Sequence, residues 1–234
     1  MSEQHKTGYH TSLFTVSPPD NGILEFTVAA APVAAQAKLK SRKAALRDEV
    51  RKLFVPLRYL LSGEVHVDVE WAIHEKDRYE TDAAPDIDAI LKPLLDAMSG
   101  PDGVLVDDSQ VQSVACRWID YGSREQSLKF EIRFLAHEWV SKKGLIFVHF
   151  GDSLCFPLED TMPTDLALRC AETVRRMLDT KRKIEAETGD YYAARRMLPA
   201  QRMFRRTRVA QKFDVLEEAV YIGRLRKAQR VAIT

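Results

Sequence analysis

The stretch that decides the fold and the chemistry of this chain is PDIDAILKPLLDAMSGPDGVLVDDSQV, residues 85–111. Apolar residues recur at helical spacing over residues 86–98, which predicts a helix, and Pro93 inside it should kink the helix or limit where it starts. The cluster SGPDG predicts a turn, and a short apolar strand over residues 104–106 should follow it. Four aspartates therefore lie at the ends of predicted elements: Asp86, Asp88, Asp107 and Asp108.

Three of these carboxylates, those of Asp86, Asp88 and Asp108, converge if the apolar strand packs beside the start of the helix. Carboxylates at such short range repel one another and raise their own pKa values, and a hard divalent cation resolves that conflict. Mg²⁺ prefers oxygen ligands, usually one or two carboxylates with waters and substrate phosphates completing its shell. Lys92 follows Asp88 by four residues and shares its helix face, where an ammonium group can stabilise charge on a phosphate.

The same residues also have an ordinary structural interpretation. Aspartates at helix starts cap free backbone N–H groups, the Asp107–Asp108 pair is typical of a turn, and Asp88 with Lys92 can form a surface ion pair. Spacing alone leaves both interpretations open.

The motif as a whole resembles the signature of the RusA family of Holliday-junction endonucleases. Three segments carry the resemblance: DIDAILK at 86–92, DAM at 96–98 and GVLVDDSQ at 103–110. The family pattern is D-x-D-N-x-x-K, then a helix with D-x-L, then a glycine and an apolar strand ending in D-D-x-Q. The chain departs from this pattern at Ala89, where the family has asparagine. The resemblance covers about residues 23–137.

The resemblance implies a metal-dependent enzyme that cuts four-way DNA junctions as a homodimer. By position, Asp86, Asp88 and Asp108 would be catalytic metal ligands, with Asp107 adjacent to them and Lys92 as the catalytic lysine. The implied cofactor is Mg²⁺, with Mn²⁺ as the alternative. The implied partner is branched DNA, with no nucleotide cofactor and no membrane.

The remaining elements of this part complete an α/β (α+β) domain with a two-layer β-α-β-α-β-β order and a mixed sheet. Residues 23–30 predict a strand, and residues 34–54 a helix that ends before Pro56. Strict alternation over 64–74 gives the strongest strand signal, and residues 111–121 and 127–135 predict two further strands.

A second candidate metal site lies on the polar face of the 64–74 strand, formed by His66, Asp68, Glu70 and His74. Same-face neighbours on a strand are about 6.6 Å apart, too far for all of them to bind one small ion. We therefore expect a solvated or DNA-facing surface.

The charge changes sign along the chain. Residues 1–138 contain 16 basic and 22 acidic side chains, a net charge of −6, whereas residues 139–234 contain 19 and 12, a net charge of +7. We expect a RusA-like nuclease domain over 1–138 and a basic, mostly helical extension over 139–234. The extension should contain a hairpin over 145–158 and three helices: one from Thr164, capped by that residue or Asp165, one around 190–212 and one at 214–230.

The second of these helices carries a dense cluster of arginines, with no acidic residue over 195–212. Arginine is suited to phosphate contacts, which provide affinity without reading sequence. The predicted DNA-binding residues are Arg195, Arg196, Arg202, Arg205, Arg206 and Arg208. A solvated helical face, or a surface that pairs with the acidic first part, is the alternative.

Several function classes have no support. The chain lacks H-E-x-x-H, a Walker glycine loop, G-x-S-x-G and EF-hand spacing, and its three cysteines form no C-x-x-C pair. No apolar stretch is long enough to span a membrane and the N-terminus is polar, so we expect a cytoplasmic protein. The leading interpretation is a Mg²⁺-dependent junction endonuclease acting in recombination and repair. The alternative is a non-catalytic DNA-binding protein that retains the nuclease scaffold.

Overall fold

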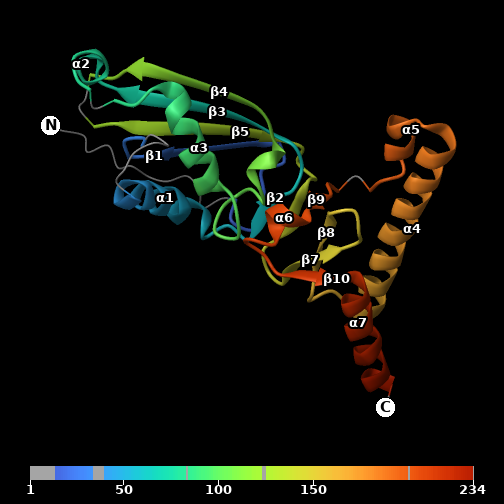
Figure 1. Ribbon diagram of the computed structural model, residues 1–234. Coiled ribbons are helices and arrows are strands. Elements are labelled where there is room, and N and C mark those ends of the chain that lie inside the picture. The colour runs from blue at the N-terminus through green and yellow to red at the C-terminus, as the bar shows by residue number, and fades with distance from the viewer. Residues whose placement is uncertain (1–13, 34–39, 83, 123–124, 200, 234) are drawn as a thin grey trace. The chain divides into compact units, whose positions relative to one another are not determined.

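The computed structural model describes residues 14–33, 40–82, 84–122, 125–199 and 201–233. The chain divides into two compact units, unit 1 ending at Trp139 and unit 2 beginning at Val140 (Figure 1). Each unit is built around its own four-stranded mixed sheet, so the predicted α/β (α+β) class is confirmed.

The sheet of unit 1 has the strand order β1-β5-β3-β4 (Figure 1). Strand β5 runs antiparallel to both β1 and β3, whereas β3 and β4 are parallel. The strands are β1 (Ile23–Val28), β3 (Val65–Ile73), β4 (Val111–Asp120) and β5 (Ser127–Phe134). The other elements of this unit are α1 (Lys40–Phe54), β2 (Tyr59–Leu61), α2 (Glu75–Tyr79), α3 (Ile87–Met98) and the 3-10 helix η2 (Asp108–Gln110).

The alternation along β3 decides which face of this sheet is buried. Val65, Val67, Val69 and Trp71 are almost fully buried, and they share one core with apolar residues of α1 and α3. Burial of such side chains contributes about 1.5–3 kcal/mol each. The helices therefore cover one face of the sheet, as the two-layer prediction requires.

Two local predictions in unit 1 need correction. The expected strand over residues 104–106 does not form, since only Leu105 makes isolated bridges, to Leu61 and Ser99. The segment is buried and folds back on the end of α3, where the N–H groups of Val104 and Leu105 both donate to the Met98 carbonyl. Helix α3 continues through Pro93, and residues 34–39 of the predicted first helix lie outside the described residues.

The sheet of unit 2 has the order β10-β7-β8-β9. The predicted hairpin is confirmed: β7 (Leu145–His149) and β8 (Leu154–Glu159) are antiparallel. Residues 150–153 join them in a turn closed by the Leu154 N–H and the Gly151 carbonyl, and its central residues Asp152 and Ser153 have positive φ, which matches the twist of a hairpin. The flanking strands β9 (Phe204–Arg205) and β10 (Val215–Glu217) were not predicted, and β6 (Trp139–Ser141) spans the division between the units.

The helices of unit 2 are α4 (Thr164–Thr188), α5 (Tyr191–Arg195), α6 (Arg206–Val209) and α7 (Glu218–Ile233). The predicted helix over 190–212 is wrong, because it is interrupted around Pro199 and Phe204 joins the sheet as part of β9. Phe204 is only 2% exposed and packs edge-on against Phe147, so burial outweighs local helix propensity. The predicted side-chain cap of α4 is also wrong, since its N-cap is Pro163, which makes no side-chain cap hydrogen bond. Within the described ranges, no helix is long and apolar enough to cross a membrane.

Candidate active site

The start of α3 presents two exposed carboxylates. Asp86 is the N-cap residue in an extended conformation, but its side chain makes no capping hydrogen bond, and Asp88 lies in the first helical turn. The positive end of the helix dipole favours negative charge at this position. Asp86 thus occupies the N-cap position of α3 without using its carboxylate as a cap.

The Asp107–Asp108 turn is built around two buried polar side chains. Asp107 is 2% exposed, and its Oδ1 accepts a hydrogen bond from the Ser109 N–H at 3.1 Å. Gln110 is fully buried, and its Oε1 accepts a hydrogen bond from the Asp107 N–H at 2.9 Å, completing a capping box. Asp107 and Gln110 thus close the turn that carries Asp108.

The amide of Gln110 also ties this turn to another part of unit 1. Its Nε2 donates to the carbonyl oxygens of Leu61 at 2.9 Å and Gly63 at 2.7 Å, between β2 and β3. All these groups are shielded from water, so the loss of any of them would leave an unpaired buried partner. The glutamine of the D-D-x-Q motif therefore has a positioning role, which sequence reasoning missed although the motif contained it.

Lys92 joins the two halves of the motif. Its Nζ lies 2.7 Å from Asp108 Oδ2 and 2.6 Å from Asp96 Oδ1. The Asp108 side chain is 17% exposed, whereas that of Lys92 is 58% exposed. Partial burial lowers the pKa of Lys92, but its bonds with Asp108 and Asp96 outweigh that effect and leave the pKa above its usual value. The lysine is thus a stable cation beside Asp108.

The geometry bears on the predicted metal ligands in two ways. Lys92 contacts Asp108, and Asp88 precedes Lys92 by four residues on the same helix face. Across the described part of the chain, however, no three His, Cys, Asp or Glu side chains are grouped so as to hold a metal ion. The convergence of Asp86, Asp88 and Asp108 stays a prediction. Carboxylate oxygens are ligands that suit a hard divalent cation.

The polar face of β3 is occupied by cross-strand partners. Arg133 contacts Asp68 at 2.6 Å, and Arg117 contacts Glu70 at 2.9 Å. His66 Nδ1 lies 2.7 Å from Ser113 Oγ. His74 is the N-cap of α2, where its Nδ1 accepts a hydrogen bond from the Lys76 N–H. These contacts support the expected solvated face.

The six predicted DNA-binding arginines do not share one helix. They are distributed over α5 and the residue after it, the following loop, β9 and α6: Arg195, Arg196, Arg202, Arg205, Arg206 and Arg208. Arg206 pairs with Glu217 at 2.8 Å, and buried Phe204 and Val209 anchor the segment that carries the last three. Arg202 is half-buried, and the other five arginines are exposed.

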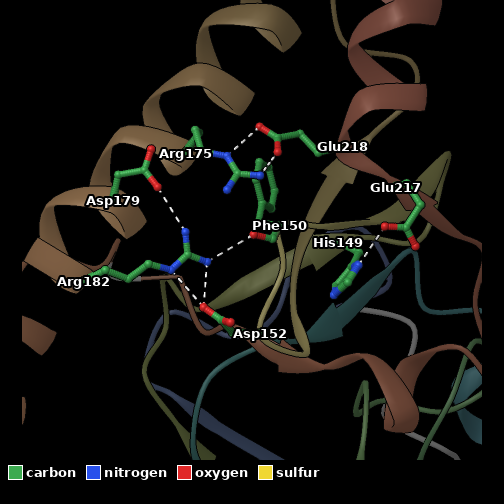
Figure 2. A network of polar contacts seen from close by, with 8 residues as sticks. All are labelled: His149, Phe150, Asp152, Arg175, Asp179, Arg182, Glu217 and Glu218. Atoms are coloured by element: carbon green, nitrogen blue, oxygen red, sulfur yellow. Dashed lines mark hydrogen bonds and ion pairs between the residues drawn. The ribbon is translucent and has the colours of Figure 1, made fainter.

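Sequence reasoning missed a second basic surface, on α7. No acidic residue occurs in residues 219–233, a signal that was readable from the sequence. The exposed cations are Arg224, Arg226, Lys227 and Arg230. Glu218, at the start of this helix, pairs with Arg175 of α4 at 2.9 Å (Figure 2).

Helix α4 is also joined to the β7–β8 hairpin. Arg182 contacts Asp152 in the hairpin turn at 2.8 Å and Asp179 on its own helix at 3.0 Å (Figure 2). Arg175 lies over the ring of Phe150, 5.7 Å from its centroid. Both arginines are half-buried and make their contacts within unit 2.

Comparison with known proteins agrees with this architecture. The model of the endodeoxyribonuclease RusA family matches residues 25–133, which include the sheet of unit 1 and both halves of the acidic motif. A domain of the RusA endodeoxyribonuclease family therefore spans residues 25–133 of unit 1, and the helical region that follows is an extension beyond the matched domain. No curated protein matches the chain significantly.

Proposed function

We propose that the protein is a Mg²⁺-dependent, structure-specific endonuclease that cleaves four-way DNA junctions in recombination and repair. The observation that carries this proposal is the contact between Lys92 and Asp108, which brings the helical and turn halves of the family motif together. In this division of the chain, residues 1–138 form the nuclease domain and residues 139–234 a DNA-contacting extension.

Asp86, Asp88 and Asp108 would hold the metal, with Asp107 next to them. A bound Mg²⁺ or Mn²⁺ would polarise the scissile phosphate and activate a water. The buried contacts of Asp107 favour a positioning role for it, since its carboxylate closes the turn that presents Asp108. Lys92 would stabilise the negative charge that develops on the phosphate, because a lysine is protonated at neutral pH and its bonds with Asp108 and Asp96 favour the charged form further.

The expected assembly is a homodimer. A four-way junction is a two-fold object, so a symmetric dimer presents two equivalent sites to opposing strands. The exposed arginines of unit 2 would supply sequence-independent contacts to the phosphates of this branched DNA.

The second candidate is a non-catalytic DNA-binding protein on the same scaffold, and Ala89 is the observation that favours it. The family has an asparagine at this position. Here Ala89 donates its backbone N–H to the Asp86 carbonyl, and it has no side-chain amide to offer a neighbouring carboxylate.

Cleavage of labelled DNA separates the two functions. The full-length protein is incubated with a four-way junction and with linear duplex of the same sequence, with and without Mg²⁺. The endonuclease proposal expects paired nicks in the junction only when Mg²⁺ is present. Tight junction binding without cleavage in Mg²⁺ or Mn²⁺ would favour the second candidate.

A further inference from the structure

The most exposed aromatic side chains of unit 2 lie on α5, beside two of the exposed arginines. Tyr192 is 78% exposed, the highest value among the large apolar and aromatic side chains in the described ranges, and Tyr191 is 46% exposed. Their rings meet edge to face, with centroids 5.5 Å apart. The two rings thus form a contiguous aromatic surface that is open to solvent.

The local structure holds these rings outward. Gly189, at φ 68°, ends α4 in the left-handed conformation, and Asp190 then caps α5 by accepting the N–H groups of Tyr192 and Ala193 at 2.9 Å each. Ala194, two residues after Tyr192, is fully buried and anchors the side of this short helix that lies away from Tyr192. The helix therefore presents Tyr192 to solvent.

Cations lie beside the pair. Lys181 of α4, which is ion-paired with Glu185, lies over the Tyr191 ring, with its Nζ 4.9 Å from the centroid. Arg195 and Arg196 follow Tyr192 by three and four residues, which places them beside it at the end of α5. The nearby acid Asp190 is used as the helix cap.

We propose that Tyr191 and Tyr192 form a stacking platform for unpaired nucleobases of branched DNA, with Arg195 and Arg196 contacting the adjacent phosphates. Exposed aromatic rings bordered by cations are the arrangement that binds single-stranded nucleic acid, because every base offers a π-face for stacking. This inference rests on the proposed function, and it names what the extension contributes: recognition of bases that are unpaired at the branch point.

The test compares Tyr192→Ala with Tyr192→Phe in the full-length protein, without divalent metal so that no DNA is cut. Binding is measured by fluorescence anisotropy to a four-way junction with unpaired thymines at its centre, to a fully paired junction and to linear duplex. Tyr192→Ala should weaken binding to the thymine-containing junction about tenfold and change duplex binding less than about twofold. Tyr192→Phe, which keeps the ring, should bind like the wild type.

The matched control is Tyr121→Ala, which removes an exposed tyrosine of unit 1 and should leave all three affinities unchanged. A second measurement locates the contact directly: 5-iodouracil at the unpaired positions should crosslink to Tyr191 or Tyr192 on irradiation. Equal binding by Tyr192→Ala and wild type, with crosslinks elsewhere, would overturn the platform while leaving the proposed nuclease intact. A wild-type protein that binds no junction would overturn both.

Discussion

Units 1 and 2 each contain a four-stranded mixed sheet, but they use their charged side chains differently. In unit 1 the exposed sheet face pairs its own charges, as in Lys129 with Glu25 and Arg133 with Asp68, and the acidic motif is fixed by buried hydrogen bonds of Gln110. In unit 2 several arginines remain exposed on short elements, held there by buried anchors such as Phe204. Under the proposed function, unit 1 would hold a site that needs exact placement, and unit 2 would present a surface that needs charge.

The largest expected effect tests the site in unit 1. Asp108→Asn keeps the shape of the side chain and removes its charge, so a metal held partly by Asp108 loses a ligand. We expect junction cleavage to fall by about 10²- to 10⁴-fold, since metal catalysis is worth several kcal/mol of barrier. Binding should stay equal or become tighter, because repulsion of phosphate decreases. The control is Asp102→Asn, in an exposed turn, which should leave the cleavage rate unchanged. Cleavage by Asp108→Asn at the wild-type rate would show that Asp108 is not a metal ligand.

The next effect separates the two partners of Lys92. Lys92→Gln removes the ammonium group beside Asp108 and should lower the cleavage rate about 100-fold, the size typical of a lost charge-stabilising group. Asp96→Asn removes the other partner, one turn further from the start of α3, and should change the rate only a few-fold. Single-turnover cleavage at saturating protein measures both. Equal losses in the two variants would mean that the cleavage rate depends on the ion pairs of Lys92 and not on its position beside Asp108.

A third prediction concerns the stability of unit 1. Gln110→Ala removes three buried hydrogen bonds and leaves the Leu61 and Gly63 carbonyls and the Asp107 N–H without their partner. The free energy of unfolding should fall by about 2–4 kcal/mol, measured by urea denaturation. The same substitution at exposed Gln112 should cost less than about 0.5 kcal/mol. Similar small changes in both variants would show that the turn is held by other contacts.

The smallest effect tests the surface of unit 2. Replacing Arg195, Arg196 and Arg205 together with glutamine should weaken binding to all junction sequences alike. The slope of log affinity against log salt should decrease by up to about 3, near 0.9 for each phosphate that the protein no longer neutralises. As control, Arg117→Gln with Lys129→Gln removes two cations that are ion-paired on the sheet of unit 1. If the control variant changes the salt slope and the arginine variant does not, the phosphate contacts are made by the sheet of unit 1 and not by unit 2.

Local patterns in the sequence predicted the elements that depend on local physics. The alternation over 64–74 predicted β3 because one face of that strand is buried, and the apolar runs around a two-residue turn predicted the β7–β8 hairpin. The predicted helix over 190–212 failed because it followed composition, whereas Phe204 gains more from burial against Phe147 than from helix formation.

For the candidate site, the sequence predicted a class of chemistry from four aspartates and a lysine, which lie within residues 25–133 matched by the RusA family model. Only the tertiary structure decided that Lys92 contacts Asp108, sixteen residues away, and that Gln110 joins the turn to backbone some fifty residues earlier. The physical reason is that the spacing of a motif is a property of neighbouring residues and can be read directly from the sequence. Contacts between distant residues depend instead on how the sheet and α3 pack in one core, and no local periodicity records that packing.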